Sequence, residues 1–172
     1  MGQKVVTGEV RLSYVNLFEP RAIVEGGPMK YGVSILIDKN DKAEVKKIQD
    51  VIDKLIREEQ SILKTTKGLK TPLRDGDDKD AEGYKGHWYI SVTSKDKPLV
   101  VDEDRQDIIN PRDIYSGCYG RVSMNFFAYN KGGNKGIGVS LNSVLKLGDG
   151  EPLGGGYTRA SIDDDFADDG LL

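Results

Sequence analysis

Alternating apolar and polar residues mark most of the strands that this chain is expected to form. Residues 5–15, 31–37 and 87–93 each alternate over the length of a typical strand, and a short apolar run, PLVVD, follows at 98–102. Because neighbouring side chains of a strand point to opposite faces, the alternation also predicts which residues face the core. These are Val10, Leu12, Val33, Ile35, Ile37, Trp88, Ile90 and Val92.

The stretch 115–130 is the most informative strand, because its two faces differ in chemistry as well as in polarity. The predicted core face carries Cys118, Val122, Met124, Phe126 and Ala128. The opposite face carries Tyr115, Tyr119, Arg121, Ser123, Asn125, Phe127 and Tyr129. The turn KGGNKG is typical of a hairpin, and it leads into a final strand with Ile137, Val139 and Leu141 facing inward.

One segment has the period of a helix instead. Asp41 and Glu44 have the spacing of a capping box, and an apolar stripe continues through about residue 63. Residues 64–86 are rich in Lys, Asp and Gly, which predicts a mobile surface loop. About five strands with one intervening α-helix predict a mainly β protein built as a small closed barrel.

The composition changes near the end of the chain. Residues 1–148 are expected to form one folded domain, and residues 149–161 form a glycine-rich linker. Residues 162–172 contain five aspartates and no lysine or arginine, which predicts a disordered acidic tail. The net charge of −3 therefore hides an uneven distribution, because all 25 basic residues precede this tail.

Several classes of protein are disfavoured by what the chain lacks. No apolar run is long enough to span a bilayer, and the N-terminus does not resemble a signal peptide, so we expect neither secretion nor membrane insertion. The single cysteine, Cys118, permits no internal disulfide, and with the single histidine, His87, it cannot supply a structural zinc site. A reducing cytoplasm is the expected location.

No constellation of residues predicts catalysis, a metal or a cofactor. The acidic cluster at 75–80 lacks the ligand spacing of a calcium loop, so a solvated loop is the better interpretation. Asp102, Glu103 and Asp104 leave open one enzymatic alternative, a nuclease that would use them to hold a divalent metal.

The outward face of the 115–130 strand predicts a binding surface for single-stranded nucleic acid. Aromatic rings stack on unpaired bases, at about 1–3 kcal/mol per base, and basic side chains contact phosphates. The predicted DNA-binding residues are Tyr115, Tyr119, Arg121, Phe127 and Tyr129, extended by Tyr31, Tyr89, Lys131 and Lys135, with Arg21 and Lys30 as further phosphate contacts. The alternative is that individual rings pack under the long loop or the helix.

The acidic tail fits the same system in two ways. Its carboxylates can compete with phosphates for a positively charged groove, and its apolar residues can anchor it to a partner protein. The predicted partner-binding residues are Asp163, Asp164, Asp165, Phe166, Asp168, Asp169, Leu171 and Leu172. A solubilising tail without a ligand is the alternative.

The chain resembles the single-stranded DNA-binding proteins of tailed bacteriophages. The resemblance rests on VTGEVRLSYVNLFEPRA, GGPMKYGVSILIDK, YSGCYGRVSMNFFAYN and KGIGVSLNSVLKLGDGEPLGG. It implies an OB-fold, a five-stranded Greek-key barrel, and a non-enzymatic protein that coats single-stranded DNA in replication or recombination. It also implies recruitment of replication proteins, such as a polymerase or helicase, through the acidic tail.

The end of the chain departs from the best-known tail pattern, because Phe166 is internal and Leu172 is last. A protein–protein interaction module without nucleic-acid binding is the alternative function. The sequence leaves open whether the protein is a homo-oligomer.

Overall fold

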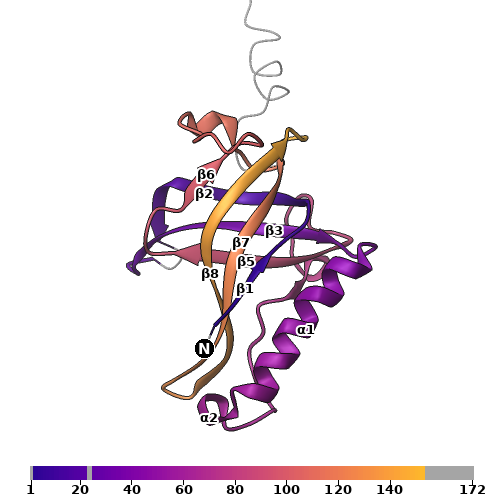
Figure 1. Cartoon of the computed structure of the whole chain (residues 1–172), viewed down its shortest axis with the longest axis vertical. Coiled ribbons are helices and arrows are strands. Elements are labelled where there is room, and N and C mark those ends of the chain that lie inside the picture. Colours follow the sequence, from indigo (N-terminus) through magenta and orange to yellow (C-terminus); the bar gives the residue numbers. More distant parts are fainter. Residues whose placement is uncertain (1, 23–24, 154–172) are drawn as a thin grey trace, which may run out of the picture.

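Five strands close into the predicted barrel in a computed structural model that describes residues 2–22 and 25–153 (Figure 1). The barrel strands are β2 (Val10–Ala22), β3 (Met29–Asp38), β5 (His87–Ser94), β7 (Tyr119–Lys131) and β8 (Asn134–Gly148). They pair in the order β7-β2-β3-β5-β8, and the pairing of β7 with β8 closes the ring. All of these pairs are antiparallel except β5 with β8, which meet in parallel at Thr93 and Ser140. The OB-fold barrel predicted from the sequence is confirmed.

Three short strands extend the sheet: β1 (Gln3–Val6) on β7, β4 (Arg74–Asp75) on β5, and β6 (Leu99–Val101) on β8. The single strand predicted at 5–15 is therefore two strands. They separate because β1 and β2 pair with different parts of β7. Between them Thr7 is buried, and its Oγ1 accepts a hydrogen bond of 3.0 Å from the Val122 backbone amide. β2 then continues to Ala22, past the predicted end of the strand.

The core faces predicted from the alternation are confirmed. Every residue predicted to face inward on β2, β3 and β5 is buried, apart from Trp88, which packs partly buried against the core. On β7 and β8 the predicted inward residues are buried as well, except Ala128 and Val139, which are partly buried against the same cluster. The predicted core thiol of Cys118 is fully buried, and burial raises its pKa.

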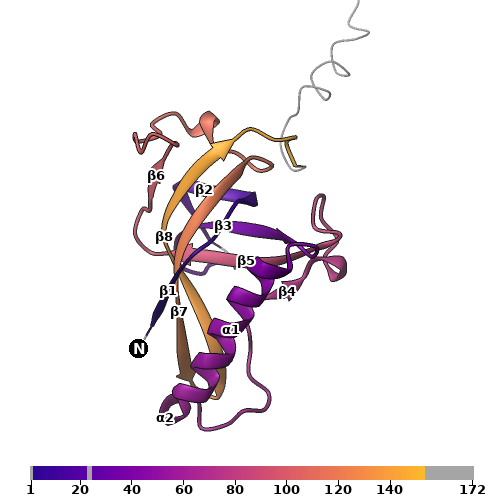
Figure 2. The ribbon, with the colours of Figure 1, turned by 45° about the vertical axis from the view of Figure 1, so that its right-hand side comes forward.

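The predicted helix is present but ends earlier than expected. α1 (Lys42–Glu58) begins with the Asp41 side chain accepting a hydrogen bond from the Glu44 amide, as the capping spacing predicts. The Glu44 carboxylate, however, accepts from the Gly8 amide at 3.0 Å, which connects the helix to the β1–β2 turn. α2 (Gln60–Leu63) follows as a separate turn, because Glu59 leaves the helical conformation. Figure 2 shows α1 running beside the long β7–β8 hairpin, which extends out of the barrel.

The prediction of a mobile surface loop at 64–86 is wrong for the second half of this segment, which packs against the rest of the fold. It contains β4 and the short helix η1 (Gly76–Asp78), and Tyr84 is fully buried. Lys39, at the end of β3, bonds both Asp75 and Asp77 and so holds this segment in place. The acidic cluster predicted as a solvated loop thus has a structural role, which depends on a lysine more than 30 residues away.

The packed chain continues beyond the domain boundary predicted at 148. The Arg11 guanidinium donates to the Glu151 carbonyl at 2.6 Å, and the Leu153 amide donates to the Ser116 carbonyl at 2.9 Å. Leu153 itself is buried with Leu36 and Tyr84 in a second apolar cluster, outside the barrel core. The linker beyond Leu153 and the acidic tail lie outside the described residues. Within the described ranges, no helix is long and apolar enough to cross a membrane.

Candidate nucleic-acid interface

A cleft of about 470 Å³ lies on the outer face of β2, β3 and β5. Three of its lining residues are basic, two are tyrosines, and none is a carboxylate in the part of the chain that the structure describes. The lining consists of Tyr14, Asn16, Arg21, Ala22, Lys30, Tyr31, Gly32, Val33, Ser34, Lys79, Ser91, Val92 and Thr93. Its chemistry suits an anionic ligand with flat apolar parts.

Small polar side chains form the floor of this cleft. Ser34 of β3 pairs with Ser91 of β5, and their hydroxyl oxygens are 3.3 Å apart. Beside them Gly32 pairs with Thr93, and a Cβ at Gly32 would approach the Val92 carbonyl oxygen to 3.0 Å. Gly32 and Ser34 are buried, whereas Ser91 is exposed and Thr93 half-buried, so the accessible part of the floor lies on β5.

Tyr14 projects from β2 at the side of the cleft. The pairing of β2 with β3 shifts register between Ser13 and Asn16, so the strand bulges at this point. Tyr14 has a φ of 46°, in the left-handed region, where a bulky residue costs about 1–3 kcal/mol. The residue is 51% exposed, and its ring centroid lies 6.1 Å from that of Tyr84. An exposed ring held in a strained conformation is typical of a binding site.

Lys79 reaches the cleft from the segment that follows η1. Its ammonium lies 5.5 Å from the ring centroid of Tyr14 and 5.6 Å from those of Tyr84 and Tyr89. The last two rings meet edge to face at 5.1 Å. Burial raises the pKa of the Tyr84 hydroxyl, so this ring remains neutral at physiological pH. Three aromatic rings thus surround one cation at the side of the cleft.

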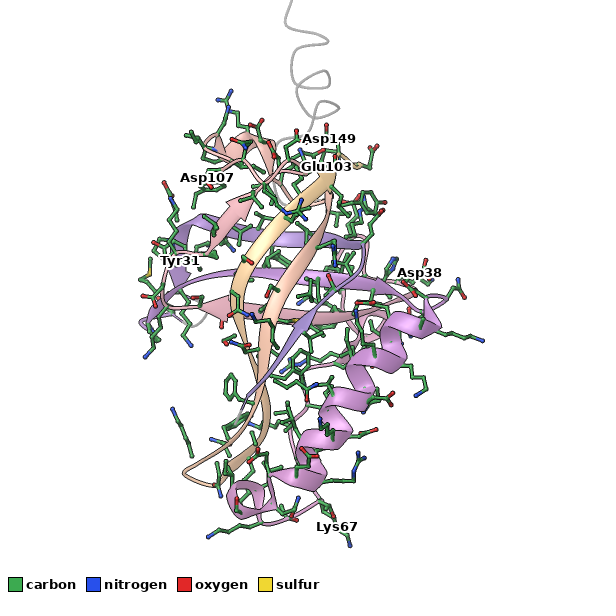
Figure 3. The ribbon with its side chains drawn as sticks, viewed as in Figure 1. Tyr31, Asp38, Lys67, Glu103, Asp107 and Asp149 are labelled. Atoms are coloured by element: carbon green, nitrogen blue, oxygen red, sulfur yellow. The ribbon has the colours of Figure 1, made fainter. Side chains whose placement is uncertain are left out.

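Four of the residues predicted from the sequence lie in or beside this cleft. Arg21 and Lys30 face each other across the β2–β3 pairing, and Tyr31 follows on β3. Figure 3 shows Tyr31 at one end of β3 and Asp38 at the other. Tyr89 is half-buried beside the cleft, against Tyr84 and under Lys79.

The predicted β7 residues face away from the core, as expected, but lie on a different part of the barrel. Tyr119, Arg121, Phe127 and Tyr129 are half-buried or exposed. β2 separates β7 from β3, and β8 separates β7 from β5, so these residues do not join Tyr31 and Tyr89 in one platform. The single surface expected from the sequence is two surfaces in the structure.

Several of these side chains already have partners. Arg121 Nε donates to the Thr7 carbonyl at 2.9 Å, and the Tyr119 ring lies under the Arg11 guanidinium at 5.8 Å. Tyr115, predicted on the outward strand face, instead precedes β7 and packs half-buried against the core, where its hydroxyl donates to the Gly150 carbonyl at 3.1 Å. Phe127 covers Gly138, where a Cβ would come within 2.7 Å of the ring.

Lys131 and Lys135 lie at the tip of the β7–β8 hairpin and do not line the cleft. The turn needs Gly132 and Gly133, which have φ values of 57° and 89°. The hairpin contacts the segment after α1, because Asn130 Nδ2 donates to the Ile62 carbonyl at 3.0 Å. Lys67 lies at the same end of the molecule (Figure 3).

Tyr14, Asn16, Lys79 and the serines of the floor were not predicted. The signal for Tyr14 was the break in the alternation at Val15, where two apolar residues follow each other within the bulged stretch. Lys79 carried no local signal, because it lies among aspartates in a segment without periodicity.

The residues of the nuclease alternative form a local turn. Asp102 Oδ1 accepts hydrogen bonds from the amides of Asp104 at 2.9 Å and Gln106 at 3.0 Å. No group of three or more His, Cys, Asp or Glu residues placed to hold a metal ion occurs within residues 2–22 and 25–153.

The sequence of the chain is similar to those of known phage proteins. Residues 3–171 match the family model described as Enterobacter phage Enc34, ssDNA-binding protein. Putative protein p50 of Acyrthosiphon pisum secondary endosymbiont phage 1 is 32% identical over 174 residues, which cover 95% of this chain and 94% of that protein.

Solved structures show the same similarity. The single-stranded DNA-binding protein from bacteriophage Enc34 in complex with ssDNA has a TM-score of 0.70 and 29% identity, over 88% of this chain and 89% of that one. A single-stranded DNA-binding protein encoded by bacteriophage T7 has a TM-score of 0.63 and 14% identity, over 100% of this chain and 99% of that one. The T7 protein shares the fold.

Proposed function

Because the chain belongs to the family of phage single-stranded DNA-binding proteins described from Enterobacter phage Enc34, a family of binding proteins and not of enzymes, we propose that it binds phage single-stranded DNA without sequence preference. The observation that carries this proposal is the cleft on β2, β3 and β5, where two tyrosines and three basic side chains meet without a carboxylate. Such a lining offers both contacts that a bare strand needs, a ring for its bases and positive charge for its phosphates.

The position of the cleft supports the same function. β3 and β5 are the second and third strands of the barrel, and OB-folds bind oligonucleotides on the face of these two strands. Tyr14 and Tyr31 stack on bases in this proposal, while Arg21 and Lys30 contact phosphates. Stacking on a ring discriminates little between bases, because every base has a π-face. We therefore expect affinity for single strands of mixed sequence.

The hairpin extends the proposed DNA path beyond the cleft. The chain from 114 to 148 contains no Asp or Glu, and Lys131 and Lys135 lie at the tip of its hairpin. The loops flanking the binding face of an OB-fold, including the one between its fourth and fifth strands, commonly contact the nucleic acid. The predicted contacts still include Tyr115, which precedes β7, and the β7 residues Tyr119, Arg121, Phe127 and Tyr129. Arg121 would have to leave the Thr7 carbonyl to reach a phosphate.

The acidic tail gives the proposed function its second part. Five aspartates follow the last basic residue, and Phe166, Leu171 and Leu172 supply apolar anchors among them. In this proposal the tail recruits replication or recombination proteins, such as a polymerase or helicase, and competes with DNA for the basic cleft. The coated strand would thereby release the tail to its partner.

A binding titration tests the proposal directly. A fluorescently labelled oligothymidine and an oligonucleotide of mixed sequence should both bind the full chain, and the affinity should fall as salt rises, at about 0.7 log units per log unit of salt for each phosphate contacted. The double variant Arg21→Glu with Lys30→Glu should bind much more weakly. The matched control reverses two exposed lysines of α1, Lys42→Glu with Lys54→Glu, and should lose little. Absence of binding to oligothymidine at low salt, or equal losses in both double variants, would refute the proposal.

A further inference from the structure

Lys79 is a cation held among aromatic rings, and the described residues supply it with no counter-ion. Its ammonium lies within 5.6 Å of three tyrosine ring centroids, and it also lines the cleft. Among residues 2–22 and 25–153, no carboxylate or other acceptor forms an ion pair or hydrogen bond with this ammonium. The backbone of Lys79 belongs to the segment held by Lys39 and not to a barrel strand.

The way in which the ammonium is held determines what it can still bind. A carboxylate fixes a lysine by cancelling its charge, whereas the faces of aromatic rings attract the cation and leave its charge and its N–H donors available. Lys39 illustrates the first case: it lies 4.9 Å from the Trp88 ring centroid, but Asp75 and Asp77 also neutralise it. Lys79 illustrates the second case, and it stands at the cleft.

We propose that Lys79 is a phosphate-binding residue of the cleft, held in position in advance by Tyr14, Tyr84 and Tyr89. This inference rests on the proposed function. In it, the Lys79 ammonium donates to a phosphodiester oxygen next to the base that stacks on Tyr14. Holding a long side chain in place before the ligand arrives removes part of the entropy cost of binding.

The position of Lys79 complements the basic residues already proposed. Tyr14, which contacts Lys79, adjoins Ser13, and Ser13 pairs with Ser34 on β3. Lys30 lies four residues before Ser34 on the same strand, which corresponds to roughly 13 Å of extended chain. A strand that crosses the serine floor would therefore meet a positive charge at each end, with Lys30 at one end and Lys79 at the other.

The salt dependence of binding separates this role from a purely structural one. For Lys79→Met, the slope of log affinity against log salt should become shallower by about 0.7, and affinity for oligothymidine should fall roughly eightfold at about 50 mM salt. Lys79→Arg keeps the charge and can lie against the same rings, so it should keep the wild-type slope. The matched control is Lys97→Met, which removes an exposed lysine that lies over the ring of Phe18, outside the cleft.

The outcomes distinguish this inference from the proposed function. If the wild-type chain binds oligothymidine and Lys79→Met has the same slope as Lys97→Met, the inference is refuted and the proposed function stands. If the wild-type chain does not bind, the proposed function itself fails. Thermal unfolding of each variant shows whether the chain is still folded. A Lys79→Arg variant that is folded but has the shallow slope of Lys79→Met would also refute the inference.

Discussion

Lys39 and Asp77 form an ion pair of 2.7 Å that joins the end of β3 to the segment carrying Lys79. The same ammonium lies 2.6 Å from Asp75 Oδ1. One lysine therefore binds the residue before η1 and a residue within it. The hydrogen bond from Lys39 is the main cause that lowers the pKa of Asp77, and the bonds to Asp75 and Asp77 raise the pKa of Lys39. Asp77 is exposed, whereas Lys39 and Asp75 are half-buried, so the contribution of these ion pairs to stability is modest and their main effect is to hold this segment in place.

The Lys39–Asp77 ion pair should weaken in acid. Because the pKa of Asp77 is lowered in the folded state, its contribution is fully present above the ordinary aspartate pKa, about 3.9, and is lost as pH falls through the lower folded value. Asp77→Asn should therefore unfold at a lower temperature than the wild type at pH 7, and the difference should shrink towards pH 3. Asp50→Asn, which breaks the exposed Lys46–Asp50 pair of α1, is the control and should change little. An Asp77→Asn deficit that does not vary with pH would contradict this prediction.

Gly76 should not tolerate a side chain. A Cβ at this position would lie 2.2 Å from the Tyr84 carbonyl oxygen and 2.5 Å from that of His87. Both atoms belong to the backbone, so Gly76→Ala must displace the segment, and we expect a loss of about 1–3 kcal/mol in the free energy of unfolding. Urea denaturation measures this loss. Gly148→Ala has no atom within 4 Å and is the matched control. Equal stability of the two variants would contradict the packing described for Gly76.

Tyr14→Asn should separate binding from stability. Asparagine tolerates the left-handed conformation better than tyrosine, so relief of strain should offset much of the lost ring contact with Tyr84. We expect the free energy of unfolding to change by less than about 1 kcal/mol, while single-strand affinity falls roughly 5- to 150-fold, the value of one stacked base. Tyr14→Phe keeps the ring and should bind like the wild type. Unchanged affinity of Tyr14→Asn would remove Tyr14 from the proposed site.

Deletion of residues 162–172 should tighten single-strand binding if the tail competes for the cleft. The gain should be largest at low salt, because the competition is electrostatic. Replacing the five aspartates with asparagines in the full-length chain is the control for length, and it should give the same gain. Titration of labelled oligothymidine measures both variants. Affinity that stays the same or falls would show that the tail does not occupy the cleft.

The sequence predicted the strand faces correctly because a sheet with one buried face requires apolar residues at every second position of its strands. Val33, Ile35 and Ile37 could be placed in the core without any knowledge of their partners. The long loop could not be predicted in the same way. Gly76 and Tyr84 look like ordinary loop residues until Lys39 anchors their segment and Tyr84 packs with Leu36 of β3.

The sequence by itself determined the barrel strands, the main helix, the outward side of β7 and the chemical class of ligand, because each depends on residue periodicity or local composition. Only the tertiary structure decided where the candidate site lies. It separated the β7 rings from Tyr31 and brought Tyr14 and Lys79 to the same cleft, although 64 residues separate them along the chain. A contact of this kind arises from strand order and register, and neither is encoded in the local pattern around either residue.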